Sequence, residues 1–75
     1  MNISELRGLL LTGHIREGIL KSTGQGWAVA LEDETGQQFP LTDNTGHEKH
    51  YHSLDNATSI LRDMGVSNIC VVENF

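Results

Sequence analysis

One stretch of regular alternation constrains this chain more than any other feature. Between residues 27 and 32, the large apolar side chains of Trp27, Val29 and Leu31 alternate with small or charged ones. A period of two is typical of a half-buried β-strand. Turn sequences rich in glycine flank this strand at 23–26 and 33–36, and Gly36 can take a positive φ after a type I turn. The chain is therefore expected to build a sheet from hairpins.

Four other segments fit strands of the same sheet. Residues 15–22 form a strand that Gly18 is expected to weaken, and residues 37–42 return after the turn at 33–36. Pro40 lacks an N–H group, which places that third strand at a sheet edge or gives it a bulge. Residues 48–52 can form a short fourth strand. Residues 66–73 are apolar without alternation, which indicates a last strand that is central or covered on both faces.

Apolar residues at three- and four-residue spacing predict two helices. The first covers about residues 3–11, with Asn2 or Ser4 as its N-cap and Glu5 completing a capping box with Asn2. The second is the main helix, which begins after Ser53 as N-cap and ends at Gly65.

The predicted fold class is α+β, in the order α-β-β-β-β-α-β. A small antiparallel sheet of three to five strands packs on the main helix, from about Ser53 to Met64, and the short N-terminal helix lies beside it. The expected core consists of large apolar residues of the strands and the main helix, together with one alanine: Trp27, Val29, Leu31, Phe39, Leu54, Ala57, Ile60, Leu61, Ile69 and Val71.

Length and charge limit the functions that this chain can have. Its 75 residues predict a single domain over 1–75. Five basic residues against ten acidic ones give a net charge of −5, which argues against binding nucleic acid through its phosphates. The single cysteine, Cys70, fits a reducing compartment. No apolar run approaches the roughly 20 residues that span a bilayer, so a cytoplasmic protein without a membrane partner is expected.

Three histidines are the candidates for a metal site. His47, His50 and His52 fall within six residues, with Asp43 nearby, and imidazoles at short spacing are the usual start of a transition-metal site. On an extended strand, His50 and His52 share a face and His47 does not. Two nitrogen ligands without a third bind a metal weakly. The pattern therefore favours a polar outer face of a strand, and no metal or cofactor is expected.

No group of residues has the pattern of a catalytic site. Cys70 lies in an apolar run, and apolar surroundings raise the pKa of a thiol, so it is interpreted as a small core residue. Ser53 lacks a G-x-S-x-G context and is explained as a helix cap. The acidic run Glu32, Asp33 and Glu34 is interpreted as a solvated hairpin tip, with an acidic decoy of DNA phosphates as the alternative. We expect a protein that is not an enzyme.

Parts of residues 26–66 follow a pattern found in integrases. It comprises the strand start Gly26-Trp27, the D-x-x-G turn at 33–36, the aromatic Tyr51 and the helix start Ser53-Leu54. This pattern is similar to the sheet and helix of the arm-type DNA-binding domains of tyrosine-family phage integrases. The resemblance implies a sheet that lies in the major groove. Nucleic-acid binding is therefore the alternative function, which the acidic charge disfavours.

The whole chain also resembles short proteins carried by proteobacterial plasmids and integrated elements, commonly labelled as plasmid replication or partition related. The similarity rests on the segments 40–43, 53–55 and 71–73, with Gly46 and Tyr51 between them. It implies a non-enzymatic accessory protein of a plasmid or mobile element. Since the surface is acidic and strand edges are exposed, we expect a small protein-interaction module. The apolar last strand carries no charge that repels a second copy, which predicts a two-fold homodimer or another protein partner.

Overall fold

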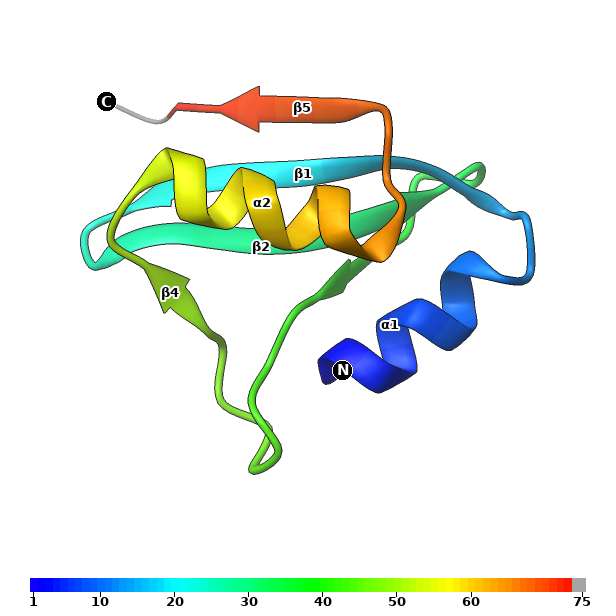
Figure 1. The fold of residues 1–75 in the computed structure, drawn as a ribbon, viewed down its shortest axis with the longest axis horizontal. Helices are drawn as coiled ribbons and strands as arrows, with labels where there is room; N and C mark the ends of the chain where they lie inside the picture. Colours follow the sequence, from blue (N-terminus) through cyan, green and yellow to red (C-terminus); the bar gives the residue numbers. More distant parts are fainter. Residues whose placement is uncertain (74–75) are drawn as a thin grey trace.

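Two helices and five strands follow one another in the predicted order (Figure 1). The computed structural model describes residues 1–73. Helix α1 spans Ile3–Leu10 and helix α2 spans Leu54–Met64. The strands are β1 (Ile15–Thr23), β2 (Gly26–Asp33), β3 (Gln38–Pro40), β4 (His50–Tyr51) and β5 (Ile69–Val72). The α+β class is confirmed. Within the described residues, neither helix has the length and apolar character needed to cross a membrane.

All five strands belong to one mixed sheet, in which the β1–β2 hairpin is the longest pair. β1 pairs antiparallel with β2 from Ile15 opposite Asp33 to Thr23 opposite Gly26. The other side of β2 is shared by β3, which pairs near Leu31, and β4, which pairs near Trp27. β5 lies on the outer side of β1, so the strand order is β3-β2-β1-β5, with β4 also on β2.

The last strand differs from its prediction in two ways. β5 runs parallel to β1, from Gly18 opposite Ile69 to Lys21 opposite Val72, so an entirely antiparallel sheet is wrong. β4 is antiparallel to β2 and so has the direction of β1. α2 then carries the chain back along the sheet, and a helical crossover of this kind leads to a parallel strand. β5 is also an edge strand rather than a central one, because it forms one end of the strand order.

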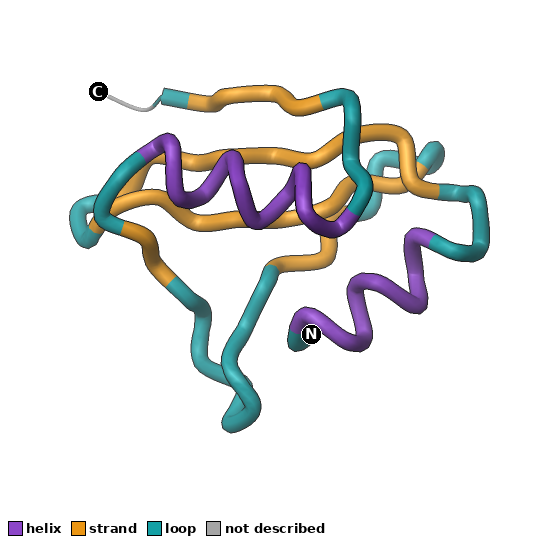
Figure 2. The backbone as a smooth tube through the Cα atoms, in the orientation of Figure 1, coloured by secondary structure: helices purple, strands orange, loops and turns teal. Residues whose placement is uncertain are grey.

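Figure 2 shows where the two helices begin and end. The residues at these ends confirm the predicted caps. The Asn2 side chain accepts a hydrogen bond from the Glu5 N–H at 2.9 Å, and the Glu5 carboxylate accepts one from the Asn2 N–H at 3.0 Å. These two bonds form the expected capping box. At α2, Ser53 Oγ accepts from the Asn56 N–H at 3.1 Å, and Gly65 ends the helix with a φ of 98°.

The core lies between the two helices and one face of the sheet. The predicted core residues Val29, Leu31, Ala57 and Leu61 are buried. Five others are half-buried against them: Trp27, Phe39, Leu54, Ile60 and Ile69. The prediction missed four buried residues that complete the core: Leu6, Leu20, Leu41 and Val66.

Val71 was predicted as core, and that prediction is wrong. Its residue surface is 46% exposed. The cause is the position of α2, which lies over β1 and β2 and leaves β5 to one side (Figure 1). β5 therefore contributes the Ile69 side chain to the core, whereas Val71 has no helix above it.

Gly18 allows the close packing of α2 on β1. A Cβ atom at this position would lie 2.9 and 3.0 Å from the two methyl groups of Leu61 and 3.1 Å from a methyl of Val66. Such distances are too short for carbon atoms, so a side chain at this position would force Leu61 and Val66 to shift or push α2 away from the sheet. Gly18, which was expected to weaken β1, therefore allows α2 to pack directly on this strand.

The third and fourth strands are shorter than predicted. β3 ends at Pro40, which confirms that the proline lies at a sheet edge. Beyond it, the chain leaves the sheet in a loop that returns at β4, and one isolated bridge, between Thr42 and Glu48, joins the two sides of this loop. Pro40 pairs with Ala30, and the next residue, Leu41, still donates its N–H to the Val29 carbonyl at 2.8 Å. The nitrogen of Pro40, which carries no N–H, therefore faces away from β2, on the outer side of the sheet.

Candidate interaction surface

The three candidate metal-ligating histidines lie in different surroundings. His50 is on β4, with its Nε2 3.7 Å from a carboxylate oxygen of Glu48. The Nδ1 of His47 lies 2.7 Å from the hydroxyl of Thr45, and His52 follows β4 with an exposed side chain. Among residues 1–73, no group of three or more histidine, cysteine or acidic side chains is close enough to hold a metal ion.

The two D-x-T-G turns are built alike. Asp33 Oδ1 accepts hydrogen bonds from the N–H and the hydroxyl of Thr35, at 2.9 and 2.6 Å, and from the N–H of Gln37 at 3.0 Å. The turn at 43–47 repeats these contacts around Asp43, at 2.8, 2.6 and 3.1 Å. The hydrogen bonds from the threonine hydroxyls come first among the causes that hold the pKa values of both aspartates below their ordinary range. Both carboxylates therefore shape turns.

This arrangement predicts a pH-dependent contribution to stability. Because the folded pKa values of Asp33 and Asp43 are lowered, the contribution is complete above the unfolded pKa, about 3.9, and is lost as the pH falls through the folded values. The double variant Asp33→Asn, Asp43→Asn lacks this titration. We expect the gap in thermal unfolding midpoint between wild type and variant to be largest near neutral pH and to close below about pH 4. A gap that is the same at every pH would contradict this assignment.

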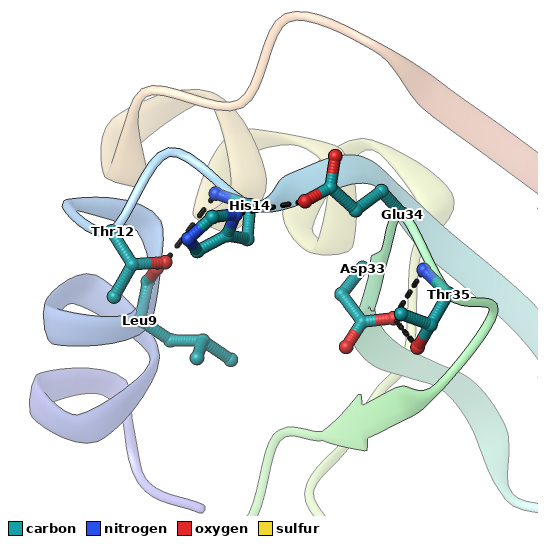
Figure 3. A network of polar contacts seen from close by, with 6 residues as sticks. All are labelled: Leu9, Thr12, His14, Asp33, Glu34 and Thr35. Atoms are coloured by element: carbon teal, nitrogen blue, oxygen red, sulfur yellow. Dashed lines mark hydrogen bonds and ion pairs between the residues drawn. The ribbon is translucent and has the colours of Figure 1, made fainter.

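The other acidic residues of the 32–34 tip also have partners within the fold. Glu34 lies beside the end of α1, where its Oε1 is 2.8 Å from His14 Nδ1 and its N–H donates to the His14 carbonyl (Figure 3). Glu32 forms an ion pair with Arg16, and the hydrogen bond from Arg16 is the main cause that lowers the pKa of Glu32. The carboxylates at 32–34 thus point to three different partners. They do not present one acidic surface of the kind an acidic decoy needs.

Cys70 is not a core residue, contrary to its interpretation from sequence. It is half-buried and pairs with Ile19 on β1. Since successive side chains of a strand alternate between faces, Cys70 lies on the face opposite to Ile69, away from the core. Ser53 is confirmed as the α2 cap.

The sheet face away from α2 is covered by long polar side chains. This open face carries Ile19, Lys21, Ala28, Ala30, Cys70 and the half-buried Val72. Ile19 and the two alanines are nearly inaccessible, and the Lys21 Nζ donates to Gln38 Oε1 at 2.7 Å. Lys21 is on β1 and Gln38 on β3, so this contact passes over β2, where small side chains leave room for it. The open face therefore leaves little apolar surface for a partner.

The two edges of the sheet differ in how they are protected. On one side, β3 and β4 have three and two residues, and β3 ends in Pro40. Short strands and prolines are devices that prevent an edge from pairing with another chain. On the other side, β5 has the sequence Ile-Cys-Val-Val, without a charge or a proline. Among residues 1–73, Val71 is one of two large apolar residues that are exposed, the other being Leu11.

The hydrogen bond at the start of β5 shows which of its backbone groups are free. The Gly18 N–H donates to the Asn68 carbonyl at 2.8 Å, so the backbone of Asn68 faces β1. Along a strand, alternate residues direct their N–H and C=O groups to opposite sides. The backbone of Cys70 therefore also faces β1, and that of Ile69 and Val71 faces outward. We call these outward groups and the exposed Val71 side chain the β5 edge.

A polar hollow lies at the other end of the molecule. It has a volume of about 290 Å³ and lies between the start of α1 and residues 42–44, with Lys49 in its lining. The backbone N–H groups at the start of α1 are partly used by the capping box. No buried polar side-chain atom within residues 1–73 lacks a hydrogen-bond partner, so the hollow has no group that requires a ligand.

Comparison with known proteins gives this chain no relative. No family model, no curated protein and no solved structure matches it. What the protein does must therefore follow from its own residues and their geometry. Of the features described, the β5 edge is the one that a monomer without a partner would be most expected to protect from pairing with another chain.

Proposed function

We propose that this protein is a small protein-interaction module, not an enzyme, which binds an extended segment of a protein partner along the β5 edge. The observation that supports this is an apolar edge strand that nothing in the described chain covers. The N–H and C=O groups of Ile69 and Val71 form a template for a further strand. In β-strand addition, main-chain hydrogen bonds supply affinity and alternate side chains supply specificity.

The contrast between the two edges supports the same proposal. Natural sheets protect their free edges because an unprotected one pairs with other chains. This chain protects the β3 side with Pro40 and with strands of three and two residues, whereas the four residues of β5 include neither a proline nor a charge. A protein that had no partner there would gain from a lysine or a proline in β5. The difference between its edges indicates that one of them is used.

We further place this module among the accessory proteins of plasmids or mobile elements, in the cytoplasm, on the resemblance of its sequence to such proteins. The charge distribution favours a protein partner over nucleic acid. The net charge is −5, and the side chain of Arg16 is paired with Glu32. An open sheet face with few free cations is a poor surface for binding phosphates.

Selection of binding peptides tests the proposed edge. A displayed library of random peptides of about ten residues, twice a usual strand length, is selected on the wild-type protein. We expect enriched peptides with apolar residues at alternate positions. The variant Val71→Pro removes one outward N–H, and the N–H groups that face β1 remain. Affinity for the enriched peptides should fall about tenfold or more, since each lost main-chain bond contributes about 1 kcal/mol and the proline ring also obstructs the strand.

The variant Leu11→Ser is the matched control. Leu11 is 89% exposed and is the C-cap residue of α1, outside the sheet, so its replacement removes an exposed apolar side chain and no backbone group of β5. Peptide binding should be unchanged in this variant. Enrichment of no peptide, or equal binding to wild type and Val71→Pro, would show that the β5 edge is not a strand-binding site.

A further inference from the structure

We infer that the strand that occupies the β5 edge is β5 of a second copy of this chain, paired antiparallel about a two-fold axis beside Cys70. This inference rests on the proposed function, because it names the occupant of the same edge. The result is a single sheet that continues across two copies, with the helices of both copies on one face.

The protection of the other edge leaves only one way for copies to pair through their sheets. A head-to-tail arrangement would add β5 to the β3 side of the next copy, where Pro40 and short strands oppose pairing. It would also continue without limit as an open filament. A β5–β5 contact uses the same edge of both copies and closes on itself. Closed two-fold symmetry is the commonest form of self-association.

The free backbone groups match this contact. With the axis beside Cys70, Ile69 of one copy lies opposite Val71 of the other, and the same pair occurs again on the other side of the axis. Both residues direct their N–H and C=O groups outward, as derived from the bond between Gly18 and Asn68. Each Ile69 and Val71 pair exchanges two hydrogen bonds, as in an antiparallel hydrogen-bonded pair. The contact therefore uses all the outward groups of these two residues.

Side chains select this register over the next one. Centred on Cys70, the pairing places Val71 beside Ile69 of the second copy on the α2 face, and Glu73 beside Ser67. Shifting the axis to Val71 would place the Glu73 carboxylate opposite Ile69, next to the core. A charge there loses water without gaining a partner, which is costly. In the register centred on Cys70, the Glu73 carboxylate instead lies beside the polar Ser67.

The position of α2 leaves room for the second copy. In Figure 1, α2 lies over β1 and β2, and β5 lies to one side of the helix, on the outer side of β1. A second β5 can therefore approach without meeting the helix. The pairing would also cover Val71, which is 46% exposed in the monomer. β5 is therefore both apolar and accessible along its outer side, as pairing with a second β5 requires.

Sedimentation equilibrium tests the association. Strand pairing over four residues makes a small interface, so the complex should be weak, with a Kd on the order of tens of micromolar. The fitted mass of wild type should rise from 8.3 kDa toward twice that value with concentration. Val71→Pro and Val71→Lys should both stay at the monomer mass, and Leu11→Ser should behave like wild type. Far-UV circular dichroism shows whether each variant is folded, and the lysine variant serves if the proline variant is not.

Cysteine cross-linking tests the register. Cys70 faces Cys70 across the axis in a non-hydrogen-bonded pair, where Cα atoms lie about 4.5 Å apart, within reach of a disulfide. Mild oxidation should therefore link two wild-type chains. The matched control is Cys70→Ser, Val72→Cys, which keeps one thiol on the same face and edge. Its two thiols would lie four residues apart along the paired strands, too far to link, so no dimer band is expected.

The outcomes separate the two proposals. A mass of 8.3 kDa at every concentration, with selected peptides still bound, would overturn the second copy and leave strand binding intact. Self-association that persists in folded Val71→Pro and Val71→Lys would overturn the β5 edge as the contact. Faster cross-linking of the Val72→Cys control than of wild type would overturn the Cys70 register.

Discussion

Replacing Gly26 with alanine is expected to remove a large part of the free energy of unfolding. Gly26 begins β2 with a φ of 132°, a conformation that residues with a side chain rarely adopt. A Cβ atom there would overlap the carbonyl oxygen of Tyr51 and lie 3.2 Å from its carbonyl carbon. Both obstacles are backbone, so no side chain can move aside. Relief requires β4 to separate from β2, which breaks the pairing of Trp27 with Tyr51.

The size of this effect is comparable with the whole stability of the domain. Backbone strain contributes about 1 to 3 kcal/mol and overpacking about as much again. A domain of 75 residues has a free energy of unfolding of about 4 to 11 kcal/mol. Urea unfolding followed by circular dichroism measures the loss. The neighbouring Gly24→Ala is the control, because a Cβ at position 24 has no atom within 4 Å. Equal stability of the two variants would show that β4 does not pack on Gly26 as described.

Features set by neighbouring residues could be predicted from the sequence. The capping box of Asn2 and Glu5, the Ser53 cap and the Gly65 stop each depend on residues within one helical turn. The strand at 27–32 was found because its alternation is local. For the same reason, the edge position of Pro40 follows from the chemistry of a single residue.

Features set by distant contacts could not be predicted in this way. Leu6 and Leu41 each lie on the apolar side of a locally predicted element, but they are fully buried because α1 and the chain after β3 enclose the same core, and this contact joins residues far apart in the sequence. Consecutive burial from Gly18 to Leu20 arises because side chains on both faces of β1 are covered, by α2 on one face and by polar chains on the other. The local alternation of β1 was therefore imperfect, and Leu20 was missed.

The candidate interaction surface depended on the least predictable feature of all, the position of the last strand. An apolar run without alternation fits a central strand as well as an uncovered edge strand. Only the strand order, in which β5 lies on the outer side of β1 with no strand beyond it in the described residues, decides between the two. The histidine cluster shows the opposite case: residues that are close in sequence lie in a loop and a two-residue strand, with different neighbours.

Replacing Leu61 with alanine is expected to cost about 2 to 5 kcal/mol of the free energy of unfolding. Leu61 is fully buried and packs directly over Gly18. Because Gly18 has no side chain, nothing on β1 can move into the space that the leucine leaves. Leu11→Ala removes the same atoms from a residue that is 89% exposed, and should change stability little. A loss below about 1 kcal/mol at Leu61 would contradict its place in the core.

A double variant tests whether the cost arises from this contact in particular. Gly18→Ala alone forces a Cβ to 2.9 Å from a Leu61 methyl and should cost about 1 to 3 kcal/mol by overpacking. In the Leu61→Ala background, that methyl is absent and the added Cβ fills part of the cavity. Gly18→Ala should then be neutral or stabilising in this background. The double variant should therefore lose less stability than the sum of the two single losses, by more than the roughly 0.5 kcal/mol within which the effects of independent sites add. Strict additivity in urea unfolding would mean that Leu61 and Gly18 do not touch, and that α2 lies elsewhere on the sheet.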